Sequence, residues 1–171
     1  MIYEPAEDSF LLQKYVRKYA KGKVLDMGTG SGIQALTALE KTKDVLAVDI
    51  DEEIVKEAKK KGIKARTSNL FSNVRGKFDL IIFNPPYLPE DKREPKSSAL
   101  ATTGGKKGYE IIEKFLKDAK KFLKKDGKIL LIFSSLTGNV EKLFKRYEYK
   151  FKNLEEKKVF FETIFVYLLQ S

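Results

Sequence analysis

Short apolar runs alternate with segments of helical apolar spacing along most of this 171-residue chain. Several of the runs are uninterrupted, which is typical of strands that are buried on both faces of a sheet. Strands that alternate with helices predict an α/β fold, in which helices cover both faces of a doubly wound, mostly parallel sheet. The expected strands are Val24–Met27, Val45–Val48, Ile63–Ser68, Leu80–Phe83 and Ile129–Phe133.

The remaining segments carry helix signals, a hairpin signal and two irregular stretches. At the C-terminus, Phe151 and Val159–Leu169 predict an antiparallel strand pair that forms a hairpin. Residues 1–9 and Pro89–Lys107 have no regular pattern. The second stretch follows the carboxyl end of a strand, so it is either a binding loop or lid, or a disordered solvent loop. The expected helices are Ile33–Leu39, Asp51–Lys61 with Asp51 as N-cap, Tyr109–Leu123 with Gly127 as its stop, and Val140–Tyr147.

Cysteine and histidine are both absent from the chain. Their absence excludes disulfides, thiol nucleophiles, Cys/His zinc sites and the commonest general base near neutral pH, and we expect no metal site. The net charge of +10 indicates either a polyanionic or acidic partner, or a lysine- and glutamate-rich surface of the thermophile kind. The length suits one domain, residues 1–171, and no signal peptide or membrane span is evident, so we expect a cytoplasmic protein.

A glycine-rich turn joins the first expected strand to the first expected helix, in the sequence Asp26-Met27-Gly28-Thr29-Gly30-Ser31-Gly32. Glycines let the backbone turn tightly and approach a ligand closely. The dinucleotide fingerprint requires a glycine where this chain has Ile33, so NAD and FAD are disfavoured. The turn suits a ligand without a pyrophosphate, such as a nucleoside sulfonium. A tight turn without any ligand is the alternative.

Polar residues also follow the second and third expected strands. Asp49 ends the second strand, where a carboxylate can accept hydrogen bonds from ribose hydroxyls. Asn69 and Leu70 follow the third, where a side-chain amide can bond an adenine edge through both its donor and its acceptor. The structural alternatives are a helix N-cap for Asp49, a role that Asp51 fills better, and a simple turn for Asn69.

The tetrapeptide Asn84-Pro85-Pro86-Tyr87 directly follows an apolar strand. Its two prolines fix φ, so the turn presents Asn84 rigidly at the carboxyl edge of the sheet. The side-chain oxygen of Asn84 and the carbonyl of Pro85 can hold the two N–H groups of a planar amine, and Tyr87 can stack on that group. These contacts orient a poorly nucleophilic nitrogen for attack on a methyl sulfonium. A rigid turn without a catalytic part is the alternative.

These motifs resemble the class I methyltransferases that carry an Asn-Pro-Pro-Tyr motif. The chain is most similar to the HemK/PrmC group, which methylates the glutamine of the Gly-Gly-Gln motif in translation release factors. The opening Tyr3-Glu4-Pro5-Ala6-Glu7-Asp8-Ser9 is similar to that of the archaeal and eukaryotic release-factor branch, with Ser9 in place of threonine. The resemblance implies a Rossmann-like class I methyltransferase fold, S-adenosyl-L-methionine as cofactor and protein-glutamine N5-methylation as the reaction.

The resemblance also implies a role for each motif. Gly104–Gly108 is similar to a glycine-rich loop before the next helix of the family, which favours a lid over disorder for the preceding stretch. Asn69 stands where the family commonly has aspartate, and its amide oxygen can still accept a hydrogen bond from the adenine amino group. The implied catalytic residues are Asn84, Pro85, Pro86 and Tyr87, and the implied cofactor-binding residues are Ser9, Asp26, Gly28, Gly30, Asp49, Asn69, Leu70 and Asn84.

Bacterial members of this group recognise the release factor with an N-terminal helical domain, for which this chain has no room before its cofactor turn. The similarly short archaeal and eukaryotic branch relies on a small zinc-binding activator protein that pairs with a sheet edge. The resemblance therefore implies a heterodimer, and the expected edge is the strand at Lys64–Ser68.

Other functions stay open from the sequence. The same tetrapeptide serves exocyclic base amines such as adenine N6, and the positive charge favours RNA or DNA binding. A non-catalytic partner domain that keeps the cofactor for stability is a third reading. A lysine target fits less well, because an ammonium group is not planar and must first lose a proton.

Overall fold

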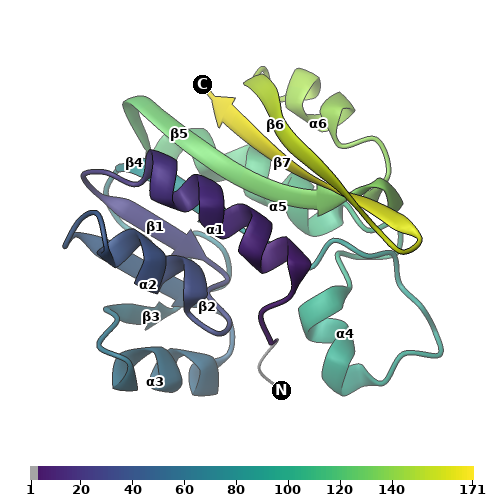
Figure 1. Cartoon of the computed structure of the whole chain (residues 1–171), viewed down its shortest axis with the longest axis horizontal. Helices are drawn as coiled ribbons and strands as arrows, with labels where there is room; N and C mark the ends of the chain where they lie inside the picture. The colour runs from purple at the N-terminus through teal and green to yellow at the C-terminus, as the bar shows by residue number, and fades with distance from the viewer. Residues whose placement is uncertain (1–3) are drawn as a thin grey trace.

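The computed structural model describes residues 4–171, in which seven strands form one sheet with helices on both faces (Figure 1). Tyr3 of the opening motif lies outside the described residues. The strand order is β3-β2-β1-β4-β5-β7-β6. Strands β1 to β5 pair in parallel, and β7 runs antiparallel to both β5 and β6. The strands are β1 Val24–Met27, β2 Val45–Asp49, β3 Ala65–Thr67, β4 Phe78–Phe83, β5 Leu123–Ser134, β6 Lys150–Val159 and β7 Glu162–Gln170. This topology confirms the predicted doubly wound sheet and its antiparallel C-terminal pair.

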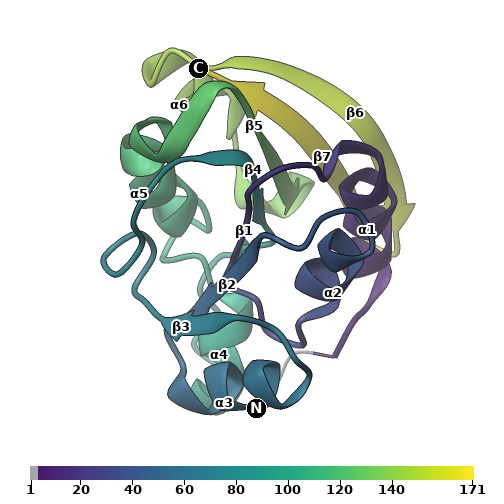
Figure 2. The same cartoon turned by 90° about the vertical axis from the view of Figure 1, so that its left-hand side faces the viewer.

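Two apolar clusters hold helices against the two faces of the sheet (Figure 2). On one face, α1 and α2 pack over the sheet through buried residues such as Leu12 and Ala35. On the other face, α5 and α6 contribute Phe115 and Phe144, both fully buried. No helix within residues 4–171 is long and apolar enough to cross a membrane. The helices are α1 Glu7–Tyr19, α2 Ile33–Leu39, α3 Glu52–Lys60, α4 Lys96–Thr102, α5 Glu110–Ala119 and α6 Glu141–Arg146, with 3₁₀ turns η1 Lys120–Phe122 and η2 Ser135–Thr137.

Four expectations about local structure were wrong. Residues 1–9 are not irregular throughout, because α1 begins at Glu7 and buries Leu11, Leu12, Tyr15 and Val16 on one side. The helix predicted to run to Leu123 ends at Ala119. Gly127 does not stop that helix but lies inside β5, where a Cβ atom would come within 2.8 Å of the Phe78 carbonyl oxygen. The stretch Pro89–Lys107 contains the short helix α4.

Other local expectations are confirmed. The Asp51 side chain caps α3 by accepting a hydrogen bond from the Glu53 amide at 2.9 Å. Strands β6 and β7 form the predicted C-terminal hairpin. Strand β3 lies at one edge of the sheet, as predicted, and β6 lies at the other. One edge therefore consists of only three strand residues, Ala65–Thr67.

Candidate active site

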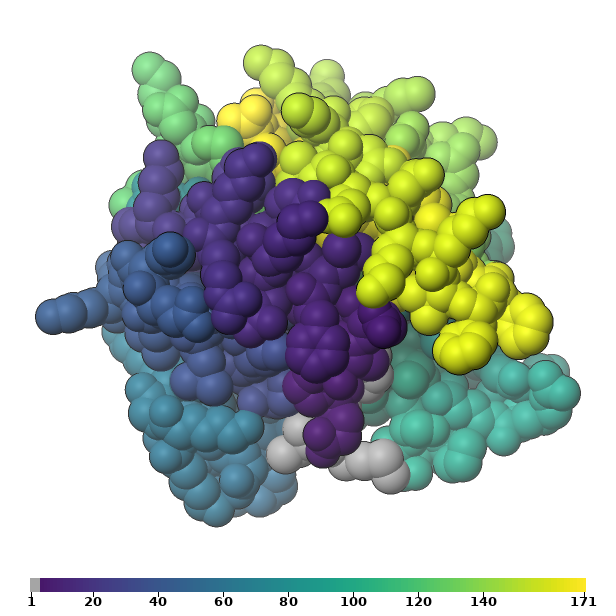
Figure 3. Space-filling model, in the orientation of Figure 1, coloured from purple at the N-terminus to yellow at the C-terminus, as the bar shows by residue number. Residues whose placement is uncertain are grey.

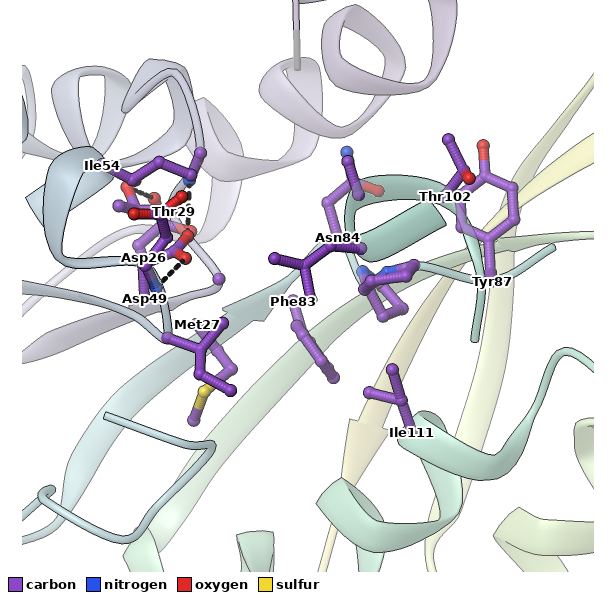
Figure 4. A pocket seen from close by; sticks show the side chains of 18 of the residues that line it. Asp26, Met27, Thr29, Asp49, Ile54, Phe83, Asn84, Tyr87, Thr102 and Ile111 are labelled. Carbon is purple, nitrogen blue, oxygen red and sulfur yellow. Dashed lines mark hydrogen bonds between the residues drawn. The ribbon is translucent and has the colours of Figure 1, made fainter. Parts of the chain in front are cut away.

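A cavity of about 370 Å³ opens beyond the carboxyl ends of β1, β2 and β4 (Figure 4). Ligands of doubly wound sheets bind at this edge, where loops from neighbouring strands meet. The structure brings every predicted site residue to the lining of this one cavity. These residues are Ser9, Asp26, Gly28, Gly30, Asp49, Asn69, Leu70, Asn84, Pro85, Pro86 and Tyr87.

The glycine turn after β1 leaves open space in front of its backbone. Gly28, Gly30 and Gly32 all have positive φ, at 66°, 52° and 83°. A Cβ atom built at Gly30 would meet no other atom within 4 Å. Glycine is therefore required there by the backbone conformation and not by packing against the protein. The turn forms a smooth wall against which a ligand can lie closely.

The carboxylate of Asp26 is buried at the base of this turn. Its Oδ2 atom accepts hydrogen bonds from the Thr29 hydroxyl at 2.7 Å and from the Ala35 amide at 3.1 Å. Its Oδ1 atom accepts no hydrogen bond from the residues that the structure describes. Burial raises the pKa of Asp26 to about 7, against an ordinary value of 3.8. A cation beside Asp26 would restore the charged form of the carboxylate.

Asp49 ends β2 on the same side of the cavity. Its Oδ2 atom accepts a hydrogen bond from the Gly30 amide, and its Oδ1 atom accepts one from the Asp51 amide, both at 3.1 Å. Burial raises the pKa of Asp49 above its usual range. Each carboxylate oxygen has a second lone pair, so Asp49 can still accept hydrogen bonds from a ligand. The N-cap of α3 is Asp51, so Asp49 does not serve as the helix cap.

The corner after β3 holds Asn69 and Leu70 at the edge of the cavity. Leu70 has a positive φ of 50°, which is uncommon for a residue other than glycine. The Ser68 hydroxyl supports this strained conformation by donating to the Leu70 carbonyl at 2.6 Å, and it accepts from the Asn73 amide at 2.9 Å. Asn69 is exposed, and its side-chain amide forms no hydrogen bond within the described part of the chain.

The tetrapeptide after β4 lies across the cavity from the Asp26, Thr29 and Asp49 group (Figure 4). Pro85 is buried and Asn84 is half-buried. The side-chain amide of Asn84 forms no hydrogen bond with residues 4–171, although it lines the cavity. Its acceptor and donors thus remain for a ligand. Below it, the Phe83 ring packs on the Phe115 ring with centroids 4.5 Å apart, which fixes the strand end.

The start of α1 closes one side of the cavity. The Tyr87 hydroxyl donates to Oδ2 of Asp8 at 3.0 Å, and both residues are buried. The Gln34 side chain donates to the Ser9 carbonyl at 2.8 Å. Its other atom, Oε1, is buried and has no partner among the described residues. Sequence reasoning missed Asp8 and Gln34, because these contacts depend on the packing of distant segments.

The segment that contains α4 closes another side. Leu88 donates its amide to the Thr102 carbonyl, and the Gly104 amide donates to the Leu88 carbonyl, both at 2.9 Å. A Cβ atom at Gly104 would lie 2.0 Å from the Gly108 carbonyl oxygen and 2.6 Å from that of Pro86. The stretch is therefore folded, with its glycine loop pressed on the backbone of the tetrapeptide. Ser97, Leu100, Ala101 and Thr102 of α4 line the cavity.

Residues 7–161 match the model of the family described as the methyltransferase small domain. A relative from Methanocaldococcus jannaschii, provisionally named a protein N5-glutamine methyltransferase, is 42% identical over 153 residues, covering 84% of this chain and 78% of the relative. The release factor glutamine methyltransferase of Streptococcus pneumoniae is 34% identical, with 80% of this chain and 52% of that enzyme covered. The chain thus spans about half the length of the bacterial enzyme.

The fold also matches solved structures. The E. cuniculi Mtq2–Trm112 complex, described as responsible for methylation of the eRF1 translation termination factor, superposes with a TM-score of 0.80 at 23% identity, covering 99% of this chain and 98% of the other. A Bacteroides fragilis S-adenosylmethionine-dependent methyltransferase in complex with S-adenosyl-L-homocysteine has a TM-score of 0.68 at 21% identity, covering 98% of this chain and 77% of that one. At these identities the likeness establishes the class I methyltransferase fold, as predicted.

Proposed function

Because this chain belongs to the methyltransferase small domain family of S-adenosylmethionine-dependent enzymes, we propose that it methylates the side-chain nitrogen of a glutamine in a translation release factor. The main observation is the Asn84 amide, held on a rigid turn at the cavity wall with no protein partner in residues 4–171. The names of the M. jannaschii and S. pneumoniae relatives support glutamine as the target. The family resemblance supports the glutamine of a Gly-Gly-Gln motif.

The cavity suits S-adenosyl-L-methionine on three observations of its lining. Open space lies in front of Gly30, Asp26 keeps one oxygen for a cation, and Asp49 keeps acceptor capacity. When bound, the cofactor supplies a methyl group activated by a sulfonium. We assign Asp26, Ser9 and the Gly28–Gly30 backbone to its methionine end. We assign Asp49 to the ribose, and Asn69 and Leu70 to the adenine.

The role of the tetrapeptide follows from the chemistry of an amide. An amide nitrogen is a poor nucleophile, because its lone pair is delocalised into the carbonyl. Oδ1 of Asn84 and the carbonyl of Pro85 accept hydrogen bonds from the two N–H groups, which fixes the direction of the lone pair and disperses developing positive charge. The surplus proton leaves to water, so a strong base is not required. The Tyr87 ring lines the same wall and offers a surface for the planar amide.

A small protein partner at the β3 edge completes the proposal. Ala65–Thr67 pair with β2 on one side, and the other side of β3 is a sheet edge. Such an edge presents backbone donors and acceptors that a strand of a partner can take up. The Trm112 subunit of the structural neighbour supports a partner of this kind. Zinc binding by the partner rests on the family resemblance. Since release factors act in translation, we place the enzyme in the cytoplasm.

Transfer of labelled methyl groups to three substrates tests the proposal: a release factor, transfer RNA and duplex DNA, each with and without the small partner. We expect label on the release factor, lost when its motif glutamine is replaced, and a loss of roughly a hundredfold or more in kcat for Asn84→Ala, as for other residues that stabilise developing charge. Label on nucleic acid only would favour a base amine as the target. Cofactor binding without transfer to any substrate would favour a non-catalytic domain.

A further inference from the structure

Two phenylalanines form the turn of the C-terminal hairpin. Strand β6 ends at Val159 and β7 begins at Glu162, so Phe160 and Phe161 are the two turn residues. Their exposures of 98% and 97% are the largest among the large apolar residues that the structure describes as exposed. Scattered apolar residues are normal on a protein surface, but two adjacent and fully exposed aromatic rings form a patch.

Neither the backbone nor the core explains this pair. Phe160 has a positive φ of 50°. Two-residue hairpin turns prefer glycine, asparagine or aspartate at such positions, and a bulky side chain there is strained. The rings also gain nothing from burial in the protein itself. A feature that opposes local preference and adds no packing is expected at a functional site.

The turn end of the hairpin lies beside the wall of the active-site cavity. The Thr163 amide donates to the Ser135 hydroxyl at 3.0 Å. Burial raises the pKa of Glu162, and the Ser134 hydroxyl and the Asp8 carboxylate are close enough to shift it as well. Asp8 is the residue that accepts the hydrogen bond from Tyr87. The turn therefore lies beside the start of α1, which closes one side of the cavity (Figure 3).

The surroundings of the turn favour a protein over a nucleic acid. The charges at the turn end of the hairpin are mixed, because Lys158 and Glu162 flank the turn in the chain and Lys157 forms an ion pair with Glu7. This mixture of charges offers a phosphate backbone no basic groove to follow. Exposed aromatic rings are, in contrast, the side chains that anchor protein interfaces.

We propose that Phe160 and Phe161 dock the folded domain of the protein substrate that carries the target glutamine, by entering an apolar depression on its surface. This inference rests on the proposed function. A single glutamine side chain fills only the end of the cavity, so affinity for a protein substrate must come from contacts outside it. The hairpin supplies such a contact on a rigid two-strand support.

The test uses a turn variant that should fold at least as well as the original chain. Phe160→Gly with Phe161→Asn removes both rings and installs a preferred hairpin turn, with glycine at the positive-φ position. Leu36→Gln is the matched control, since Leu36 is 40% exposed on α2 and does not line the active-site cavity. Steady-state methylation is measured on an intact release factor and on a short peptide with its glutamine motif, each with the small partner present.

We expect the turn variant to lose about tenfold to a hundredfold in kcat/KM on the intact factor, through KM, as for removal of interface anchors. Rates on the peptide, cofactor affinity and melting temperature should match those of the Leu36→Gln control. Equal losses on factor and peptide, or no loss on either, overturn the docking role. A loss confined to RNA methylation assigns the rings to base stacking and also overturns it. If the unaltered chain fails to methylate the factor, the proposed function fails and the docking surface falls with it.

Discussion

Replacement of Asp26 by asparagine should stabilise the empty protein and weaken cofactor binding at the same time. No cationic side chain of residues 4–171 forms an ion pair with the buried carboxylate, and its burial raises its pKa to about 7. Asparagine keeps an oxygen for the Thr29 hydroxyl and the Ala35 amide, which both donate to Asp26 in the structure. The variant therefore removes a buried negative charge without removing the hydrogen bonds that hold the turn.

The pKa values set the size and the pH range of this effect. The folded pKa is raised above the ordinary value of 3.8, so the folded state binds the proton more tightly than the unfolded chain. The contribution of Asp26 to stability is thus fully present below about pH 4 and is lost as the pH rises through about 7. The difference of roughly three pH units corresponds to about 4 kcal/mol at pH 8. Asp26→Asn should recover a large part of that near pH 8 and little near pH 4.

Cofactor binding should have the opposite dependence on pH. The ammonium group of the cofactor is expected to bind the ionised carboxylate of Asp26. Below about pH 7 the carboxyl group must first lose its proton, so the affinity for the cofactor should fall about tenfold per pH unit. Asp26→Asn should bind weakly at every pH and lack this dependence. Asp49→Asn is the control, because burial raises the pKa of Asp49 in the same direction.

Urea unfolding of the empty chain and calorimetric titration with S-adenosyl-L-methionine, at several pH values between about 4 and 8, measure both effects. A variant that is no more stable than the original chain near pH 8 would refute the buried-charge argument. An unaltered pH profile of cofactor binding in Asp26→Asn would refute the pairing with the ammonium group.

Three further substitutions test the cavity walls. Tyr87→Phe keeps the ring but removes the donor to the buried Asp8 carboxylate, so thermal or urea unfolding should show a loss of about 1–3 kcal/mol and methyl transfer should slow; unchanged stability would contradict the value placed on this bond. Gly104→Ala places a methyl group 2.0 Å from the Gly108 carbonyl oxygen, so transfer and stability should both fall by amounts typical of overpacking, about 1–3 kcal/mol in stability, and a neutral result would show that the loop moves easily. Phe115→Ala empties a fully buried site against the strand that carries the tetrapeptide, and urea unfolding should show a loss of about 3–5 kcal/mol; a much smaller loss would mean that the core collapses around the gap.

Much of the fold was predictable because its signals are local. The apolar runs of β1, β2, β4 and β5 and the Asp51 cap of α3 depend on residues that are close in sequence. Helix α1 could have been predicted as well, since Leu11, Leu12, Tyr15 and Val16 recur at helical spacing. The start of β5 could not, because the polar stretch Lys124–Asp126 lies on an exposed part of that strand and gives no strand signal.

The candidate site was predictable for residues whose chemistry is carried by a motif. The glycine turn, Asp49 and the tetrapeptide each follow a strand, and parallel strands bring their carboxyl ends together. The contacts of Gln34 with Ser9 and of Tyr87 with Asp8 join residues that are 25 and 79 positions apart. Such pairs are decided by how α1 packs on the sheet, for which a single sequence has no signal.

A β-bridge between Leu88 and Thr103 separates the Asn84–Tyr87 turn from the segment beyond it. The chain leaves the cavity wall at Leu88 and returns to it at Thr103. The residues between them therefore form a loop whose ends are held together and which contains the short helix α4. Doubling the length of a flexible loop costs only about 0.6 kcal/mol in closure entropy. Insertions and deletions between the two residues can therefore reshape the mouth of the cavity over evolution while the tetrapeptide stays in place, so the choice of substrate can change independently of the transfer chemistry.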